Sequence, residues 1–385
     1  MKTIQKKKLG IVGSGQLGKM LLEEAVKWDL NTAVLANEEN APCKVLCHEY
    51  VVCKSYFDFD AVYAFGKSCD IVTIEIEHVN VDALEKLERE GIQVYPQPAV
   101  LRTIQDKGLQ KDFYTHHGLP TAPYRHFASA QEIRDAVTGA TLSFPFVQKL
   151  CKGGYDGKGV EIIETEVDLQ RLMDGASIVE EKIAIHTEYA VMVARNTQSE
   201  TAVYDAVEMV FEPEANLLDV LVYPARVSDA LHEKIHDLAL QVSTAFGHIG
   251  LLAVEMFTDA AGNLYVNEVA PRPHNSGHHT IEASICSQFE QHLRCLYGLA
   301  PGSARALQQA VMVNLLGAKN HTGPVWYEGL EDVLKHPNVY VHLYGKTTTK
   351  PFRKMGHITV CDDDINKALE TAHTIKKQIQ VKSTT

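Results

Sequence analysis

The sequence lacks the features of a secreted, membrane-bound or nucleic-acid-binding protein. Its first apolar stretch, Leu9 to Val12, is interrupted by Gly10 and ended by Gly13, which is too short for a signal peptide or a membrane span. Basic residues are in the minority, with 37 Lys and Arg against 49 Asp and Glu and a net charge of −12. Since nucleic-acid binding requires a concentration of Lys and Arg, we expect a cytoplasmic protein with neither a membrane nor a nucleic-acid partner.

Paired cysteines are also absent. The eight cysteines of the 385-residue chain are scattered without a CxxC pair, so neither a disulfide framework nor a zinc site is indicated. Cys43, Cys47 and His48 are close in sequence, but no second pair of ligands completes a site. We therefore expect reduced thiols that are mostly buried.

The order of apolar patterns predicts three regions. Strand-like runs first alternate with helical patterns, which predicts a Rossmann-like parallel sheet of α/β type. Pro96 and Pro98 end this series, and we expect a helix over 99–117. Later strands alternate polar and apolar residues, which is typical of antiparallel α+β structure; a helix is expected over 281–296 and a small β-rich region at the end. The predicted domains are 1–103, 104–302 and 303–385.

A glycine motif follows the first predicted strand. Gly13, Gly15 and Gly18 match GxGxxG at the start of a helix, where backbone N–H groups can hold a phosphate. Glu38 lies near the position of a ribose-binding acid, so an NAD-dependent oxidoreductase is permitted. Alternatively, the glycines serve only the tight turn and the packing of helix on sheet.

A second glycine-rich segment follows a strand that ends near Lys149. Residues 152–159 combine four glycines with two lysines and enclose Tyr155 and Asp156. A flexible backbone with cations suits a lid over a polyphosphate, but the spacing is not that of a P-loop. A plain surface hairpin is the alternative, and it leaves Tyr155 and Asp156 unexplained.

Two glutamates are predicted to face each other across a hairpin. A turn over Asp259 to Asn263 would place Glu255 directly opposite Glu268, where like charges are destabilising. A bound cation would remove that penalty, and carboxylate oxygens shared with substrate phosphates favour Mg²⁺. A solvated edge pair is the alternative, which the apolar neighbours of both residues weaken. The next segment adds Arg272 and His274, an anion-binding group and a proton-transfer group.

Five segments in order resemble the ATP-grasp superfamily and, within it, the family of N5-carboxyaminoimidazole ribonucleotide synthetases. The likeness runs almost end to end. The matching segments are GQLG at 15–18, EIEHVN at 75–80, GGYDGKG at 153–159, NEVAPRPHNSGH at 267–278 and RKMGH at 353–357.

The resemblance implies a central ATP-grasp domain, with a lid over about 120–185, and a homodimer. It also implies a reaction of purine (IMP) biosynthesis: ATP and Mg²⁺ convert bicarbonate to carboxyphosphate, which carboxylates the exocyclic amine of 5-aminoimidazole ribonucleotide. In this family the N-terminal glycine loop faces that substrate rather than NAD.

The resemblance also implies the residues of the site. Lys107 and Lys149 would hold ATP phosphates, Glu180 to Ile183 the adenine and Glu188 the ribose. Arg272, His274 and Asn275 would act on bicarbonate and carboxyphosphate, and Glu255 and Glu268 would carry Mg²⁺. The full ATP set is Lys107, Lys149, Gly154, Asp156, Gly157, Lys158, Gly159, Glu180, Glu181, Lys182, Ile183, Glu188, Asn267 and Glu268. The substrate set is Gly15, Gln16, Leu17, Glu75, Tyr155, Asp156, Lys346 and Arg353, in which Lys346 and Arg353 would clamp the 5′-phosphate.

Two positions depart from the family pattern. Phe211 stands near the place where family members often carry a nucleotide-contacting His, and Ala270 stands where the wider superfamily often has a metal-binding Asn. The nearest rival is the formate-dependent glycinamide ribonucleotide transformylase, which shares the three-domain plan. The NAD-dependent oxidoreductase and a catalytically silent nucleotide-binding regulator rank behind it.

Overall fold

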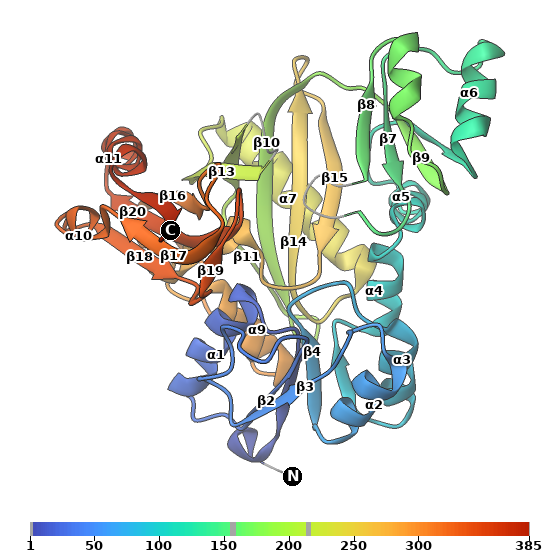
Figure 1. The fold of residues 1–385 in the computed structure, drawn as a ribbon. Coiled ribbons are helices and arrows are strands. Elements are labelled where there is room, and N and C mark those ends of the chain that lie inside the picture. Colours follow the sequence, from blue (N-terminus) through green and yellow to red (C-terminus); the bar gives the residue numbers. More distant parts are fainter. Residues whose placement is uncertain (1–2, 155–158, 213–216, 385) are drawn as a thin grey trace.

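A computed structural model describes residues 3–154, 159–212 and 217–384. Its N-terminal region is a parallel sheet in the order β3-β2-β1-β4-β5, drawn in blue at the bottom of Figure 1. β1 (Leu9–Val12), β2 (Thr32–Ala36) and β4 (Ile71–Ile74) are wholly buried, as expected of parallel strands covered on both faces. β3 (Glu49–Val52) and β5 (Gln93–Tyr95) form the edges. The predicted Rossmann-like sheet is confirmed.

The strand order of this sheet creates a crevice. The chain leaves β1 toward α1 (Gln16–Lys27) and β2 on one side, and continues through α2 (Phe59–Lys67), β4 and α3 (Val81–Arg89) on the other. Ligands bind open α/β sheets outside the carboxyl ends of the strands at such a reversal. The glycine motif after β1 and Glu75 after β4 therefore meet at the same edge.

The helix expected over 99–117 is two helices, so that prediction was wrong. α4 (Pro98–Ile104) ends before Asp106, and α5 (Lys107–His116) begins after it. The Asp106 carboxylate accepts hydrogen bonds from the backbone N–H groups of Gly108 and Leu109, which makes it an N-cap rather than an interior residue. Lys107, the first residue of α5, therefore lies beside Cys151, and its N–H donates to the Cys151 carbonyl at 2.8 Å.

The central sheet is antiparallel and extends into the C-terminal region. Its order is β15-β14-β10-β12-β13-β16-β20-β18, with β11 (Thr201–Val203) paired to β10. α7 (Asp229–Phe246) packs on β10 and β14. Because β13 pairs with β16, the sheet is continuous across residue 303. Its strands are β10 (Ile185–Arg195), β12 (Val207–Glu212), β13 (Leu217–Tyr223), β14 (Gly250–Asp259), β15 (Leu264–Ala270), β16 (Gln309–Leu316), β18 (Val339–Leu343) and β20 (Lys354–Asp362).

Two smaller sheets complete the molecule. The first, in the order β6-β9-β7-β8, lies at the upper right of Figure 1 with α6 (Ala130–Thr138) on it. The second, in the order β19-β17-β21, belongs to the C-terminal region together with α10 (Leu330–Val333) and α11 (Ile365–Gln378). Their strands are β6 (Tyr124–Phe127), β7 (Phe146–Leu150), β8 (Val160–Ile163), β9 (Ser177–Glu181), β17 (Gly323–Glu328), β19 (Thr348–Thr349) and β21 (Gln380–Ser383).

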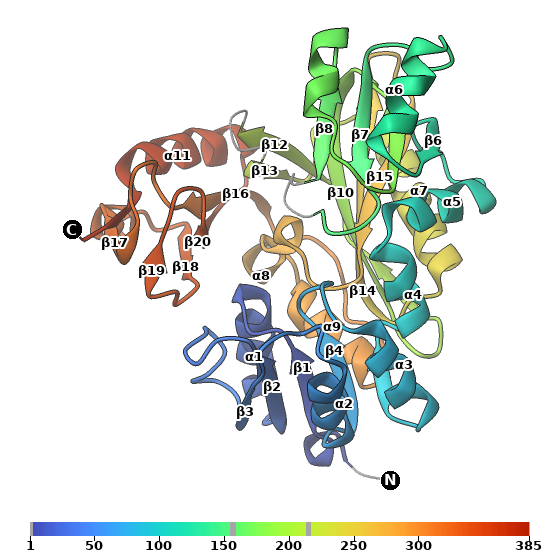
Figure 2. The same ribbon diagram turned by 45° about the vertical axis from the view of Figure 1, so that its right-hand side comes forward.

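The helix expected over 281–296 is also interrupted, which is a second correction. Residues 284–287 separate α8 (Thr280–Ala283) from α9 (Gln288–Leu296), and the Ser287 side chain accepts from the Glu290 N–H and caps α9. Both ribbon views show α9 between the N-terminal region and the central sheet (Figures 1 and 2). The buried His292 joins the two, since its Nε2 lies 3.0 Å from Thr73 Oγ1 and its Nδ1 accepts from the Leu251 N–H at 3.0 Å.

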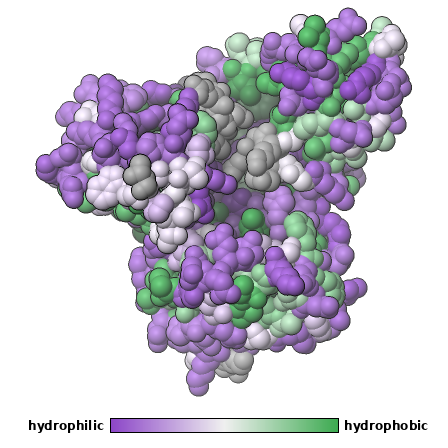
Figure 3. Space-filling model, in the orientation of Figure 1, coloured by the Kyte–Doolittle hydropathy of each residue, from purple (hydrophilic) through white to green (hydrophobic). Residues whose placement is uncertain are grey.

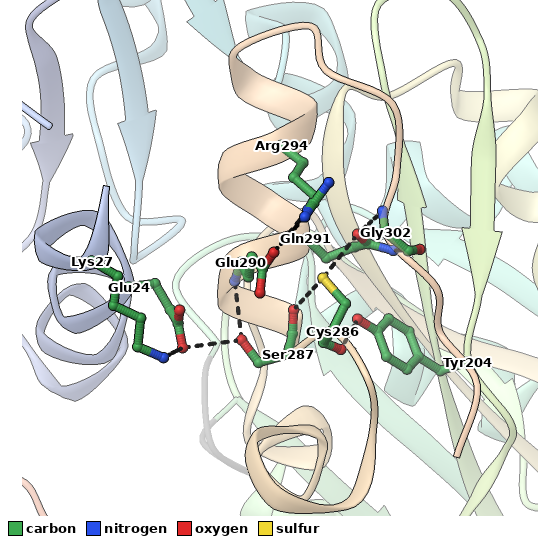
Figure 4. A network of polar contacts seen from close by, with 9 residues as sticks. All are labelled: Glu24, Lys27, Tyr204, Cys286, Ser287, Glu290, Gln291, Arg294 and Gly302. Atoms are coloured by element: carbon green, nitrogen blue, oxygen red, sulfur yellow. Dashed lines mark hydrogen bonds and ion pairs between the residues drawn. The ribbon is translucent and has the colours of Figure 1, made fainter. Parts of the chain in front are cut away.

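A polar network locks α1 against the same helix (Figure 4). Ser287 Oγ donates to Glu24 Oε1 at 3.4 Å, and Lys27 Nζ reaches the same oxygen at 2.9 Å. Deeper in the network, Gln291 exchanges two hydrogen bonds with the backbone of Gly302. The N-terminal region is thereby fixed to the central one.

The cysteines are mostly buried thiols, as expected. All eight cysteines are free thiols, and all but Cys47 and Cys53 are buried. No helix among the described residues is both long and apolar enough to cross a membrane.

Candidate active site

Figure 3 shows a hollow with hydrophilic walls where the N-terminal region, the C-terminal region and the four-stranded sheet face one another. The predicted site residues come from these three regions and from the central sheet between them. Tyr155, Asp156, Gly157 and Lys158 lie outside the described residues. Gly154 and Gly159 flank them, and the Gly159 carbonyl accepts from the Leu150 N–H at 2.9 Å, which closes the base of that loop onto β7.

Glu255 and Glu268 are direct partners across β14 and β15, as predicted. The turn alone does not produce this register, because Thr258 pairs with Leu264 and Met256 with Val266. An irregularity between Glu255 and Met256 leaves Asn267 as an extra residue in β15 and brings Glu268 opposite Glu255. Such a bulge re-aims side chains and is common beside active sites. Here it lets two successive residues, Asn267 and Glu268, reach lysines of the cleft.

The glutamates of the central sheet carry opposite pKa shifts. Burial, with the nearby charges of Glu268 and Glu188, raises the pKa of Glu255. The Lys107 ammonium lowers the pKa of Glu268 despite burial, since its Nζ lies 2.8 Å from Glu268 Oε2. Burial raises the pKa of Glu188, on the neighbouring strand β10, to about 7, although the Lys149 ammonium acts to lower it. The Lys107 ammonium thus compensates Glu268, whereas burial and the neighbouring carboxylates disfavour the charge of Glu255.

This arrangement fits a magnesium ion shared with a substrate. Two opposed carboxylates with the Asn267 amide next to them offer hard oxygen ligands. Among the described side chains, no group of three or more His, Cys, Asp or Glu could enclose a metal ion by itself. A divalent cation here would therefore need further oxygens from a ligand such as a polyphosphate, and the raised pKa of Glu255 indicates a carboxylate that such a cation would stabilise.

Three lysines, Lys107, Lys111 and Lys149, pair with glutamates of the site. Lys149 at the end of β7 reaches Glu180 Oε2 at 2.8 Å and Asn267 Oδ1 at 3.3 Å. Lys111, one turn after Lys107 in α5, reaches Glu180 Oε1 at 2.8 Å. The Glu180 side chain therefore contacts two lysines. Glu181, Lys182 and Ile183 follow at the end of β9 and in the link to β10.

Arg272, His274 and Asn275 come together after β15. Arg272 Nη2 lies 2.7 Å from Glu77 Oε1, so a residue of the N-terminal region orients it. His274 Nε2 lies 3.5 Å from Glu255 Oε1, and its Nδ1 lies 2.8 Å from Ser276 Oγ. Asn275 is buried, and within the described part of the chain neither polar atom of its amide has a hydrogen-bond partner. Because such groups are costly, the amide indicates a position for a polar ligand.

The N-terminal glycine motif is filled by a carboxylate of the protein itself. Glu75 accepts from the N–H groups of Gly15 at 2.8 Å and Gly18 at 3.2 Å. A Cβ on Gly13 would come within 2.5 Å of Glu75 Cγ, so this glycine provides room for the glutamate. The Glu75 carboxylate therefore occupies the place where a dinucleotide phosphate would bind. Gln16 and the buried Leu17 form the first turn of α1, and Leu17 belongs to the core.

A cationic group faces this loop from the C-terminal region. Lys346 Nζ donates to the Lys354 carbonyl at 2.7 Å, and Arg353 Nη1 donates to the Thr348 carbonyl at 2.7 Å. Burial and the Arg353 charge lower the pKa of Lys346 to about 8. The Glu75 carboxylate acts to raise the pKa of Lys346, so the N-terminal and C-terminal regions place opposite charges close to each other.

Sequence reasoning missed two residues of the cleft. Glu77 was part of a matching segment but had no assigned role. Lys111 was not singled out, although its spacing of four from Lys107 places both lysines on one face of a helix. The departure at Phe211 is a packing residue, since its ring lies against an apolar cluster of β12, β13 and their neighbours.

Comparisons with known proteins agree with this geometry. Three family descriptions match: the ribonucleotide synthetase preATP-grasp domain over 6–105, the ATP-grasp domain over 112–289 and the phosphoribosylaminoimidazole carboxylase C-terminal domain over 310–371. The N5-carboxyaminoimidazole ribonucleotide synthase of Staphylococcus aureus is 35% identical over 93% of this chain and 94% of its own length.

Solved structures extend the likeness to the whole fold. The N5-carboxyaminoimidazole ribonucleotide synthetase of Thermotoga maritima is 40% identical, with a TM-score of 0.90 over 98% of this chain and 100% of that one. The synthase of Aspergillus clavatus, solved with ADP and 5-aminoimidazole ribonucleotide, is 32% identical, with a TM-score of 0.88 over 97% of this chain and 99% of that one.

Proposed function

Because the chain belongs to the family of N5-carboxyaminoimidazole ribonucleotide synthetases, we propose that the cleft described above binds its substrates through the residues identified there, with bicarbonate as the source of the carboxyl group. The protein is an ATP-dependent ligase that carboxylates 5-aminoimidazole ribonucleotide in purine biosynthesis. The observation that carries the residue assignment is the adjacency of two sites. One is the opposed pair Glu255 and Glu268, and the other is the segment with Arg272 and the buried Asn275 amide, which has no hydrogen-bond partner among the described residues.

The first step that we propose is phosphoryl transfer to bicarbonate. A bicarbonate oxygen attacks the γ-phosphorus of ATP, the bond to the β-phosphate oxygen breaks, and ADP leaves carboxyphosphate behind. Lys107 and Lys149 hold the phosphates while Arg272, His274 and Asn275 hold the bicarbonate, because this transfer depends on positioning and charge neutralisation. Glu255 and Glu268 would hold Mg²⁺, which supplies positive charge at the transferring group.

The second step is carboxylation. The exocyclic amine of the ribonucleotide attacks the carbonyl carbon of carboxyphosphate, the carbon–oxygen bond to phosphate breaks, and the amine loses a proton to give the N-carboxylated product and phosphate. We assign the Glu75 loop, with Gly15, Gln16 and Leu17, to the substrate and Lys346 and Arg353 to its 5′-phosphate. The opposite charges that face each other there support this assignment. Tyr155 and Asp156 keep their proposed contact with the substrate, and Gly154 and Asp156 to Gly159 their contact with ATP.

The test is ADP release from ATP and bicarbonate with Mg²⁺. One arm adds 5-aminoimidazole ribonucleotide, and the other adds glycinamide ribonucleotide with formate. We expect stimulation by the imidazole alone and its loss when bicarbonate is removed. Stimulation by glycinamide ribonucleotide and formate would overturn the substrate. Bicarbonate-independent turnover would overturn the proposed first step.

We further propose that the enzyme is a cytoplasmic homodimer, on the basis of its family. Light scattering during size-exclusion chromatography should give twice the 42.7 kDa chain mass. A single-chain mass at micromolar concentration would contradict the homodimer.

A further inference from the structure

A buried lysine on α5 has no part in the reaction described above. Lys111 is 3% exposed as a residue, which is rare for lysine unless it is paired. Its Nζ lies 2.8 Å from Glu180 Oε1 and also donates to Thr121 Oγ1. The other oxygen of the same carboxylate, Glu180 Oε2, lies 2.8 Å from Lys149 Nζ. One glutamate thus sits between two lysines of different elements.

We propose that Lys111 is a positioning residue for ATP: it compensates the charge of Glu180, so that Lys149 remains available to the nucleotide phosphates. This inference rests on the nucleotide site of the proposed function.

Exposure separates the role of Lys111 from that of the other two lysines. The side chains of Lys107 and Lys149 are 22% and 16% exposed, whereas that of Lys111 is 4% exposed. Lys107 and Lys149 can therefore meet a ligand in the cleft. The Lys111 ammonium is buried against Glu180 and therefore acts on such a ligand through its protein contacts, not by direct binding.

Charge balance gives the physical reason. Glu180 is deeply buried, so its charge requires close positive partners. With both lysines present, neither has to satisfy it alone, and Lys149 also reaches Asn267 Oδ1 at 3.3 Å. Without the charge of Lys111, Lys149 is the one cation that still pairs with Glu180 among the described side chains. A phosphate would then have to compete with a buried carboxylate for the Lys149 ammonium.

Lys111 also joins the two walls of the cleft. Glu180 belongs to the four-stranded sheet, whereas Thr121 Oγ1 donates to the Val266 carbonyl at 2.9 Å. Val266 precedes Asn267 and Glu268 in β15. The ammonium therefore links the wall that carries Lys149 to the strand that carries the proposed metal ligand, and both are needed around the same phosphates.

The test combines Lys111→Met, which removes the charge and keeps the stem, with Glu180→Gln and with the double variant. We measure Mg·ADP affinity by calorimetry and the KM and kcat for ATP. Lys111→Met should weaken Mg·ADP binding and raise the ATP KM by about tenfold, with a smaller change in kcat, while Lys111→Arg should restore most of the affinity. The double variant should bind Mg·ADP more tightly than Lys111→Met alone, because the uncompensated carboxylate is gone.

Two results would overturn the inference. The first is unchanged Mg·ADP affinity in Lys111→Met. The second is a double variant that binds no better than Lys111→Met, which would mean that Lys111 does not act through Glu180. Lys67→Met is the matched control, since Lys67 forms an exposed pair with Glu90 at 3.0 Å and should leave binding unchanged. Should Lys111→Met fail to fold, Lys111→Arg and the double variant carry the test.

The readout is independent of the carboxylation chemistry. If the wild-type protein binds Mg·ADP but does not respond to 5-aminoimidazole ribonucleotide, the proposed function fails while the role of Lys111 is still decided by binding alone.

Discussion

The acids of the N-terminal sheet and those of the central sheet stand in contrasting surroundings. Glu75 is held by two backbone N–H groups of the glycine loop, and Glu77 by Arg272. Glu255 instead faces another glutamate and has a histidine nitrogen 3.5 Å away. The protein thus satisfies both acids at the substrate loop, whereas in the central sheet Lys107 pairs with Glu268 only, and burial beside Glu268 disfavours the charge of Glu255. The first arrangement fixes geometry, and the second binds a ligand.

The largest effect is expected for Glu268→Ala. If the central pair exists for a metal-bound nucleotide, turnover should fall by at least about 10³-fold, since charge in the transition state is left uncompensated. Steady-state ADP release measures this loss. Glu331→Ala, on the exposed surface of α10, is the matched control. Near-normal turnover of Glu268→Ala would remove this residue from the metal site.

Glu75→Gln tests the other side of the comparison. The amide keeps one acceptor but loses the charge at the start of α1, which should lower the free energy of unfolding by about 1–3 kcal/mol. Urea denaturation measures the change, and calorimetry should show Mg·ADP affinity within about twofold of wild type, as expected for well-separated sites. A stability equal to that of wild type would mean that the glycine loop does not depend on this carboxylate.

Arg353→Ala tests the C-terminal region, which should contribute to binding of the ribonucleotide but not to the chemical steps. We expect the KM for 5-aminoimidazole ribonucleotide to rise about tenfold with kcat nearly constant, the pattern of an interaction equal in ground and transition states. Initial-rate kinetics at saturating ATP measure both parameters, with the exposed Arg89→Ala as control. An unchanged KM would exclude Arg353 from the phosphate clamp.

A pH dependence of stability is also expected. Because folding raises the pKa of Glu188 from 4.5 to about 7 through burial, the folded protein holds more protons than the unfolded chain between these values. The free energy of unfolding should therefore fall as the pH rises through this range. Urea denaturation from pH 5 to 8 should show a flatter profile for Glu188→Gln than for wild type. Parallel profiles would contradict the shift.

Much of the fold and site follows from the sequence because the signals are local. Buried strands and glycine turns predict the N-terminal sheet, and the hairpin predicts Glu255 opposite Glu268. The prediction did not include the bulge at Asn267, which is needed to give that pairing. A one-residue irregularity depends on packing between strands, and no local pattern in β15 announces it.

The corrections arise where one residue has competing local roles. Asp106 and Ser287 can lie inside a helix or cap one, and here each caps. The choice depends on tertiary partners such as the Cys151 carbonyl, which is distant in sequence. Lys111 was missed because its partner Glu180 is distant in sequence, on β9. The continuity of β13 with β16 likewise requires a long-range pairing.

The bulge at Asn267 also limits how this hairpin can vary among descendants of the gene. Because side chains alternate along a strand, an insertion or deletion of one residue between the turn and Asn267 would exchange the two faces of β15. Lengthening the tip symmetrically would leave Glu255 and Glu268 opposed. Length changes that preserve the enzyme should therefore occur at the tip beyond Asp259 and Asn263, whereas single-residue changes within the arms should be eliminated by selection.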